Sequence, residues 1–541
     1  MKTNKIVIVG GGTAGWMSAS TLIKAFPEKD ITVIESPNFP TVGVGESTIG
    51  QIRKWVRYIG IDEKDFIPFT DASFKTSIRF TDFYKKDSGY FDYPFGVPMN
   101  EEGGNSILDW HALRCSYPEL PPTSMVEYLF PAAQLWKNSK LSYNENKEFD
   151  NFLFENSVAY HFDATKFGIW LKEKYCIPRG VKVISATVSS INTSVDGIEL
   201  LVLDNGEKIS SDIFIDCTGF KSLLIGQALN EPFKSYSEML PNNRAWATKI
   251  NYIDREKELE VFTNSTAIEN GWCWNIPLWS RLGSGYVYSD RFVSPDEAKN
   301  EFKKYLMSSK MVVPRSEEEV NSLEFKDIPM RIGIHKRIFV KNVVAIGLSA
   351  GFIEPLESNG LFSVHEFLFA LIDILQRGEI SQFDRDMFNV RINDVFDSWA
   401  KFIAHHYSLS HRDDTPYWKE IQEKTFTDSS GDPYSSYQGK TADFYSTSKI
   451  FYSQWSSGED MSIAGMTYIG AGMNLNFIND QRLQNINFMT GYENFSGKID
   501  SMKKNWDRRL DGWKLNAEKA LTHEEFLEKN YYKNYKIIDK I

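Results

Sequence analysis

Three glycines near the N-terminus have the spacing of a dinucleotide-binding turn. Gly10, Gly12 and Gly15 match the pattern G-x-G-x-x-G, directly after the apolar run of residues 5–9 and before a segment with helical periodicity. Glycines at these positions allow a tight turn and let the backbone approach a pyrophosphate, which then binds the N–H groups at the start of the helix. Glu35 ends the second expected strand, where a carboxylate can bind a ribose hydroxyl. The pattern predicts dinucleotide binding and leaves FAD and NAD both open.

Three later motifs carry side chains that could take part in chemistry. The stretch GWCWNIP reads as a short strand, on which Trp272 and Trp274 point to the same face and can form one bulky wall. Lys75, within FKTSIRF, offers an amine whose pKa burial can depress toward neutrality. The stretch EPLESNG precedes a helix expected to start near Gly360, and exposed N–H groups at a helix start favour an anion.

The elements that position these residues lie in separate parts of the chain. A βαβ unit comes first, a second α/β stretch covers about 165–225, and a third strand, VVAIGLSA, precedes a long helical run. Such segments can belong to one sheet, so we predict an α/β fold with a discontinuous cofactor domain and a mainly helical substrate-binding lobe. The predicted cofactor domain contains residues 1–100, 150–225 and 325–380, and the predicted lobe contains residues 100–150, 226–324 and 381–541.

Composition and charge narrow the class of protein. The formal net charge is −11 without a run of Lys or Arg, which argues against nucleic acid as a partner. The four cysteines lack C-x-x-C spacing, so we expect reduced thiols and neither a disulfide framework nor a zinc site. The first apolar run is too short for a signal peptide, and no apolar stretch has the length of a membrane span. These features predict a soluble, cytoplasmic enzyme that acts on small molecules.

The order of several motifs resembles that of one enzyme family. The chain contains, in the order found in flavin-dependent halogenases of the tryptophan-halogenase family, the motifs GGGTAGWMSA, GVGEST, FKTSIRF, GWCWNIP, GLSAGFIEPLESNG and RDDTPYW. The pairing of GWCWNIP with the lysine of FKTSIRF is the most diagnostic, because ordinary flavin hydroxylases lack both. The resemblance implies an FAD-binding two-dinucleotide fold of the glutathione-reductase and aromatic-hydroxylase type. It also implies that a separate flavin reductase supplies FADH2, with which the enzyme uses O2 and a halide ion to halogenate a small aromatic substrate.

The resemblance also implies roles for individual residues. Lys75 matches the catalytic lysine, which receives hypohalous acid made at the flavin and either hydrogen-bonds it or forms a haloamine. Glu357 matches the acidic partner that orients the electrophile and accepts the ring proton, and Glu354 is the competing candidate or a structural turn residue. The backbone amides of Asn359 and Gly360 would hold the halide.

Two larger sets of residues are expected around the flavin. A shielding wall would keep the aromatic substrate away, so that a halide ion and not the ring is oxidised there; two tryptophans that only pack in a core are the alternative. The wall consists of Trp272, Trp274, Ile276 and Pro277. The cofactor-binding set consists of Gly10, Gly12, Thr13, Ala14, Gly15, Glu35, Val44, Glu46, Ser47, Val188, Leu348 and Leu361.

The sequence departs from the family at the halide and substrate positions. Asn359 stands where the family usually has Thr, so chloride, bromide and iodide are all open, and an Asn that only caps the helix is the alternative. Tyr93 replaces the His of a His-Pro-Phe element that helps to hold the indole in tryptophan halogenases, while Phe95 is kept. Free tryptophan is therefore a doubtful substrate. Further aromatic candidates, for which core packing is an equal alternative, are Tyr445, Phe451, Tyr452 and Trp455.

Other interpretations stand beside the halogenase. A flavin-dependent aromatic monooxygenase would add oxygen and not halogen, and a non-catalytic flavin-binding protein would need neither Lys75 nor Glu357. The stretch AHHYSLSHRDD contains metal-ligand residue types, but the adjacent His405 and His406 face different directions on a helix, so no metal is expected. Members of the family are commonly dimers, which makes a homo-oligomer one outcome.

Overall fold

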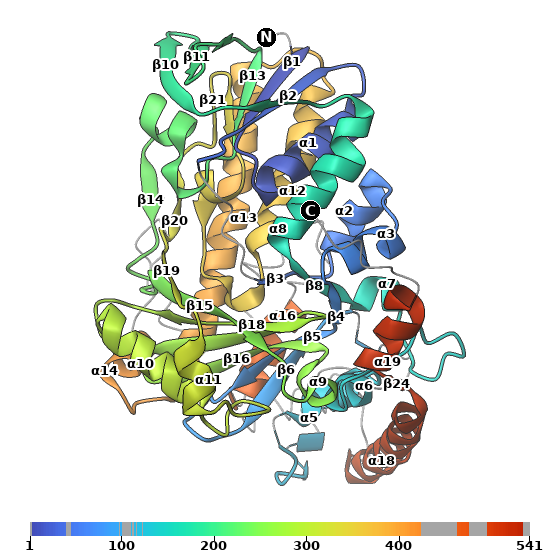
Figure 1. Ribbon diagram of the computed structural model, residues 1–541. Helices are drawn as coiled ribbons and strands as arrows, with labels where there is room; N and C mark the ends of the chain where they lie inside the picture. The colour runs from blue at the N-terminus through green and yellow to red at the C-terminus, as the bar shows by residue number, and fades with distance from the viewer. Residues whose placement is uncertain are drawn as a thin grey trace.

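The computed structural model describes residues 3–38, 45–96, 98–99, 110, 113–114, 116–121, 123–423, 463–474 and 495–533. Figure 1 shows two lobes stacked along one long axis, each organised around its own β-sheet. Of the helices in the described part of the chain, none has the length and apolar composition that a bilayer crossing requires.

The first sheet carries the N-terminal strand near its centre. Its order is β21-β22-β13-β1-β2-β9, and all neighbours pair in parallel except β21 with β22. The side chains of β1, β13 and β22 are almost all buried, since helices and loops cover both faces, and this is why the segments read as apolar runs. The predicted α/β fold is confirmed. The strands are β1 (Lys5–Val9), β2 (Asp30–Glu35), β9 (Lys182–Ser185), β13 (Ile213–Asp216), β21 (Phe339–Val340) and β22 (Val343–Ala345).

Helices pack beside this sheet and place the glycine turn. α1 (Thr13–Ala25) starts directly after the turn and packs against α8 (Ala164–Trp170) and α12 (Gly360–Leu375) (Figure 1). α1 and α12 contact each other, and residues at the starts of both helices line the same cavity. The helix starts that follow the glycine turn and EPLESNG therefore belong to the same side of the fold. A small sheet of β10 (Val188–Ser194), β11 (Gly197–Leu203) and β12 (Lys208–Ile209) lies at the outer end.

The second lobe contains a seven-stranded sheet besides its helices. The order is β19-β15-β18-β17-β16-β5-β6, and only β16 and β5 pair in parallel. The motif GWCWNIP is β17, at the centre of the sheet, and FKTSIRF enters the sheet as β5. The boundaries of the two lobes stay a prediction. The strands are β5 (Ser77–Thr81), β6 (Tyr90–Pro94), β15 (Arg244–Asn251), β16 (Phe262–Ile268), β17 (Gly271–Pro277), β18 (Arg281–Tyr288) and β19 (Lys326–Pro329).

A three-stranded sheet lies at the junction of the two lobes (Figure 1). It consists of β3 (Gly45–Ser47), β8 (Ala159–Asp163) and β4 (Ser73–Lys75), with β8 paired antiparallel to both neighbours. β3 also contacts β17 and β18 of the seven-stranded sheet. The junction sheet therefore brings the strand that ends at Lys75 close to the cofactor domain and to the wall strand, β17, which carries the residues of the predicted shielding wall.

One long helix contacts both lobes. α13 (Gln382–Ser408) packs on β21 of the first sheet and on α16 (Ile463–Gly472) and α14 (Pro416–Glu423) of the second lobe. It begins with a capping box in which Ser381 and Asp384 bind each other's backbone N–H groups. The remaining helices are α2 (Ile52–Ile59), α3 (Glu63–Phe69), α5 (Ser124–Leu129), α6 (Ala133–Lys137), α7 (Phe154–Ser157), α9 (Arg255–Glu258), α10 (Pro295–Leu306), α11 (Glu317–Ser322), α18 (Phe495–Lys519) and α19 (His523–Leu527), and the remaining strands are β7 (Lys140–Leu141), β14 (Phe233–Ser235), β20 (Gly333–His335), β23 (Gly351–Phe352) and β24 (Leu521–Thr522).

Candidate active site

The glycine turn is packed too tightly for side chains at Gly10 and Gly15. A Cβ atom added to Gly10, whose φ is +119°, would lie 2.2 Å from the carbonyl oxygen of Cys217, and one added to Gly15 would lie 1.9 Å from the carbonyl oxygen of Gly10. Glu35 lies beside the turn and accepts a hydrogen bond from Lys172. The first turn of α1 and a carboxylate thus face one space, the arrangement that a dinucleotide needs.

A cavity of about 1150 Å³ extends from this turn to the wall strand. This exceeds the roughly 300–1,000 Å³ of pockets for drug-sized ligands, so the cavity is large enough for a dinucleotide such as FAD. Gly15 lies outside the cavity wall, behind the turn, and Val44 lies outside the described residues. The predicted cofactor and halide residues that line the cavity are Gly10, Gly12, Thr13, Ala14, Glu35, Glu46, Ser47, Val188, Leu348, Asn359, Gly360 and Leu361.

Trp272, Trp274 and Ile276 line the other end of the cavity from one face of β17. The two indole rings are 6.2 Å apart between centroids, and both side chains are buried. The other face of the strand points away, where Asn275 donates a hydrogen bond of 2.7 Å to Tyr305 of α10. Alternation along a strand therefore places both tryptophans on the cavity, as the spacing predicts.

The wall is held from behind by a buried glutamate. Glu354 Oε2 accepts hydrogen bonds from Asn242 Nδ2 at 2.6 Å and from Trp272 Nε1 at 3.4 Å. Burial raises the pKa of Glu354 to about 7, against the opposing effect of these hydrogen bonds. Gly285 of β18 leaves room for the ring of Trp274, since a Cβ there would lie 2.1 Å from it. Glu354 and Gly285 thus fix the orientation of the two indoles.

Lys75 is completely buried at the junction of the lobes. Its Nζ donates hydrogen bonds to Ser358 Oγ at 2.7 Å, Ser47 Oγ at 2.9 Å and the carbonyl oxygen of Thr48 at 3.1 Å. These three acceptors and the amine form what we call the lysine site. Because Ser47 and Ser358 also line the cavity, the amine lies directly behind the cavity wall. Phe95 closes another side, with its ring centroid 5.0 Å from Nζ.

Charges around the lysine site oppose the effect of burial. Burial lowers the pKa of Lys75 well below its usual value, and the carboxylates of Glu357 and Glu46 raise it in part. Burial raises the pKa of Glu46 to about 7, with Lys75 opposing the shift. Burial therefore disfavours the charged forms of the amine and of the carboxyl groups. The amine loses its proton more easily here than at a protein surface.

Glu357 is bound by a histidine that the sequence analysis considered only as a metal ligand. Glu357 Oε1 lies 2.7 Å from His406 Nε2, and both side chains are buried. His406 Nδ1 contacts the carbonyl oxygen of Phe402 at 2.9 Å, so Nδ1 must be the donor there. The contact between Nε2 and Oε1 consequently holds one proton, either on imidazole or on carboxyl. Burial raises the pKa of Glu357, and the hydrogen bond with His406 opposes the shift.

The loop between Glu357 and α12 carries the predicted halide residues. Ser358 has a φ of +59°, and this turn directs its hydroxyl to Lys75. Asn359 directly precedes the first residue of α12, Gly360, and in the described structure its side chain makes no cap hydrogen bond. Asn359 therefore occupies the N-cap position without a capping hydrogen bond from its side chain to the described residues, and its role stays a prediction. Asn359 and Gly360 line the cavity beside Glu46, whose Oε1 would lie 3.0 Å from a Cβ on Gly360.

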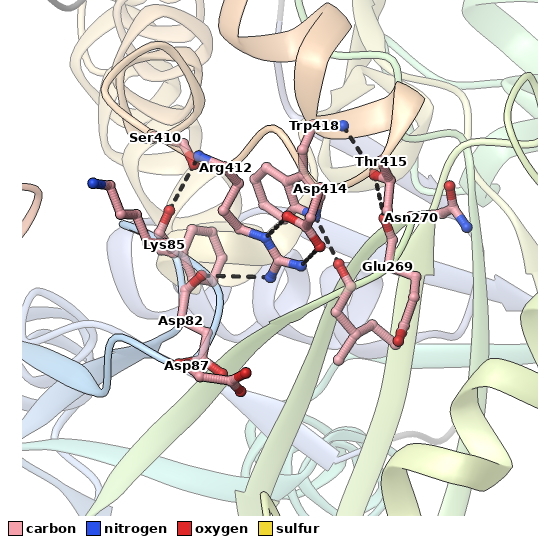
Figure 2. Close-up of polar contacts among 12 residues, drawn as sticks. Asp82, Lys85, Asp87, Glu269, Asn270, Ser410, Arg412, Asp414, Thr415 and Trp418 are labelled. Atoms are coloured by element: carbon pink, nitrogen blue, oxygen red, sulfur yellow. Dashed lines mark hydrogen bonds and ion pairs between the residues drawn. The ribbon is translucent and has the colours of Figure 1, made fainter.

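The motif RDDTPYW anchors the end of α13 to the seven-stranded sheet, as Figure 2 shows. Arg412 binds Asp414 with two hydrogen bonds of 2.8 and 2.9 Å and donates to the carbonyl oxygen of Asp82. Thr415 donates to the carbonyl oxygen of Glu269, and Trp418 donates to that of Ile268. These contacts hold the helix that supplies His406. The histidines and aspartates of this region form no cluster of three or more metal-ligand residues within the described residues.

Of the predicted substrate residues, Phe95 lies at the lysine site. Phe95 contacts Lys75, and the ring of Tyr93 on β6 lies 6.1 Å from Phe402 of α13 and 6.4 Å from Tyr468 of α16. Tyr93 and Phe95 are both buried and neither lines the large cavity. The remaining aromatic candidates, Tyr445, Phe451, Tyr452 and Trp455, lie outside the described residues.

Known proteins share this sequence and fold. The sequence model of the tryptophan halogenase family matches residues 5–467. Tryptophan 6-halogenase SttH of Streptomyces toxytricini is 34% identical over 447 residues, which cover 79% of this chain and 82% of that protein. Tryptophan 7-halogenase RebH of Lentzea aerocolonigenes is 32% identical over 442 residues, which cover 79% of this chain and 80% of that protein. The apo structure of VirX1 has a TM-score of 0.87 and 34% identity, and the match covers 98% of this chain and 100% of that chain. From the match of family, sequence and fold together, this chain belongs to the tryptophan halogenase family.

Proposed function

We propose that this protein is a flavin-dependent halogenase that uses FADH2, O2 and a halide ion to halogenate an electron-rich aromatic ring. The observation that carries the proposal is the place of Lys75, a fully buried amine directly behind two serines of the cavity wall. Such a site suits the passage of a small oxidised halogen species from the cavity to the amine, while larger molecules stay outside.

The cavity has the features that FAD requires. Reduced FAD held there would supply the electrons that activate O2, and the oxidising equivalents for the halide would come from O2. The turn of Gly10 and Gly12 would bind its pyrophosphate and Glu35 its ribose, while Trp272 and Trp274 would keep the aromatic substrate away from it. The sequence has one intact glycine fingerprint, so a separate flavin reductase is the source of reduced flavin that we propose.

The start of α12 is the halide site that we propose. Asn359 and Gly360 line the cavity at the start of this helix, and a helix start favours an anion without needing a full positive charge. A halide bound there would lie next to Ser358, whose hydroxyl accepts a hydrogen bond from Lys75. Hypohalous acid formed beside it would therefore have a short path to Lys75.

Lys75 and Glu357 would have different roles in the substitution on the aromatic ring. The amine of Lys75 would donate a hydrogen bond to hypohalous acid or become halogenated itself, and in both cases it presents the electrophilic halogen to the ring. The carboxylate of Glu357, held by His406, would accept the proton that leaves the ring. The ring would lie beside Phe95 and Tyr93, away from the flavin.

The experiment supplies regenerated FADH2, O2 and chloride, bromide or iodide separately, with a panel of indoles, phenols and pyrroles, and reads product masses. Halogenated rings support the proposal, and products heavier by one oxygen would favour a monooxygenase instead. Lys75→Ala should bind FAD normally and lose ring halogenation by a factor of about 100 or more. Lys208→Ala, at an exposed lysine, is the matched control and should keep the wild-type rate. Wild-type halogenation by Lys75→Ala would contradict the proposed role.

A further inference from the structure

A chain of buried hydroxyl groups leads from Lys75 to a histidine that none of the motifs singled out. Lys75 Nζ binds Ser47 Oγ at 2.9 Å, Ser47 Oγ lies 2.7 Å from Thr263 Oγ1, and Thr263 Oγ1 lies 2.8 Å from His161 Nε2. All four side chains are at least nine-tenths buried. They come from β4, β3, β16 and β8, so the chain exists only where the junction sheet meets the seven-stranded sheet.

The direction of each hydrogen bond in the chain follows from its partners. Ser47 Oγ accepts from Lys75 Nζ and also from Ser358 Oγ at 3.0 Å, so its own proton points to Thr263. Thr263 then accepts from Ser47 and donates to His161 Nε2. All donors therefore point from the lysine toward the histidine.

The far side of His161 is consistent with a neutral ring. Ser73 Oγ donates to the carbonyl oxygen of Pro277, so it is free to accept from His161 Nδ1, which lies 3.4 Å away. His161 thus carries its proton on Nδ1 and presents the lone pair of Nε2 to Thr263. Pro277 ends the wall strand, so the chain also connects the lysine site to the wall.

We infer that His161 receives a proton from Lys75 through Ser47 and Thr263, and so provides the neutral amine that reacts with the oxidised halogen. Three protons each move along one hydrogen bond: from Nζ to Ser47 Oγ, from Ser47 to Thr263 Oγ1, and from Thr263 to His161 Nε2. Lys75 becomes a neutral amine and His161 an imidazolium, with no net gain or loss of protons. His161 is a positioning and proton-holding residue that acts through the two hydroxyl groups, and the inference rests on the function proposed above.

The charged groups around the chain act on this transfer in both directions. Lys75 is faced by Glu46 from β3 and by Glu357 from the loop before α12, and their carboxylates stabilise its charged form only in part. Burial lowers the pKa of His161, and the charge of Lys75 lowers it further. That repulsion disappears when the proton leaves Lys75, so the histidine becomes a better acceptor at that moment.

Two neighbouring groups do not compete for the proton. His523 also lowers the pKa of His161, but its Nε2 accepts from the N–H of Phe74 at 3.1 Å and its Nδ1 donates to the carbonyl oxygen of Leu259 at 3.1 Å. Burial lowers the pKa of His523 to about 4, which keeps it neutral. Asp163, two residues after His161, is paired with Arg281 at 2.8 Å.

The test measures the neutral amine directly, with cyanate and the full-length chain. Isocyanic acid is small and carbamylates only neutral amines, and peptide mass spectrometry reports each lysine separately. The readout is the rate for Lys75 divided by that for the exposed Lys208 in the same digest, which cancels the pH dependence of the reagent. His161→Gln keeps a hydrogen-bond acceptor but takes no proton, Thr263→Val breaks the chain at constant size, and Thr263→Ser keeps it.

At about pH 6.5, near the usual pKa of His and well below that of Lys, we expect the ratio to fall at least about tenfold in His161→Gln and in Thr263→Val. It should stay within about twofold in Thr263→Ser. A wild-type melting temperature and circular dichroism spectrum show that each variant is folded, and the two positions provide independent tests. An unchanged ratio in either folded variant, or no carbamylation of Lys75 in the wild type, overturns the inference.

Halogenation provides a second readout that separates this inference from the proposed function. The rising limb of the pH–rate profile should move to higher pH in His161→Gln, with the rate recovering when solvent base removes the proton. Carbamylation needs no flavin, oxygen or halide. A chain that carbamylates as expected but halogenates nothing contradicts the proposed function alone, whereas halogenation with unchanged carbamylation in the variants contradicts the relay alone.

Discussion

The glycine turn and the lysine site open on the same cavity but are built by different means. The turn uses backbone atoms of one short segment, and its shape depends on the absence of side chains at Gly10 and Gly15. The lysine site uses side chains from distant segments, since Ser47 and Ser358 lie 28 and 283 positions from Lys75. Cofactor binding thus depends on local backbone geometry, and amine chemistry depends on the assembly of the whole fold.

The largest expected effect comes from placing a side chain in the glycine turn. In Gly15→Ala, the new Cβ would lie 1.9 Å from the carbonyl oxygen of Gly10, so the backbone must move. A distortion of this size costs about 3 kcal/mol or more, and we expect FAD to bind about a hundredfold more weakly. Fluorescence titration with FAD measures this. Gly512→Ala is the control, because a Cβ there meets nothing within 4 Å; equal FAD affinities of the two variants would contradict the dependence on backbone geometry.

An intermediate effect distinguishes the two glutamates near the lysine site. Glu357→Gln removes the group that would accept the ring proton, and we expect halogenation to fall about 10- to 100-fold with FAD binding unchanged. Glu354→Gln is the matched variant, because Glu354 binds Asn242 and Trp272 and not the lysine site. Its halogenation rate should stay within about fivefold of the wild type, because the amide oxygen of the new Gln can still accept the hydrogen bond from the indole N–H. Product formation with saturating FADH2 measures both rates, and the reverse ranking would assign the role to Glu354.

The smallest effect concerns halide affinity and pH. Burial raises the pKa of Glu46 to about 7, and this carboxyl lies beside the start of α12. Below that pH the neutral acid tolerates a nearby anion, and above it the carboxylate repels one, so halide affinity should fall several-fold as the pH rises through about 7. Line broadening in chloride NMR measures weak halide binding. Glu46→Gln should bind halide equally at both ends of this range, and a persisting pH dependence would point to another group.

The sequence predicts the local features of this molecule well. β1, the glycine turn and α1 follow from one uninterrupted segment with a strict periodicity, and the same is true of the alternation along β17. Both need only short-range rules on backbone conformation and side-chain direction. The same rules led to a mainly helical description of the second lobe, because pairings within its seven-stranded sheet, such as that of β16 with β5, join segments far apart in the sequence.

The long-range contacts of the site could not be predicted from the sequence in this way. The pairing of Glu357 with His406 joins residues 49 positions apart, and the contact of Ser47 with Thr263 joins residues 216 positions apart. Periodicity shows which face of an element is buried but not which other element covers it. His161 carried no signal because a lone histidine in an apolar strand is most often a core residue, and only the pairing of β8 with β3 and β4 reveals its neighbours.

The span of α13 has a mechanical consequence. One continuous helix of 27 residues contacts the parallel sheet near its start and the helices of the second lobe near its end, and the junction sheet provides another rigid connection. Bending between the lobes would have to break this helix or slide it across both cores. We therefore expect the two lobes to keep a constant spacing, with small molecules entering and leaving by movements of side chains and loops.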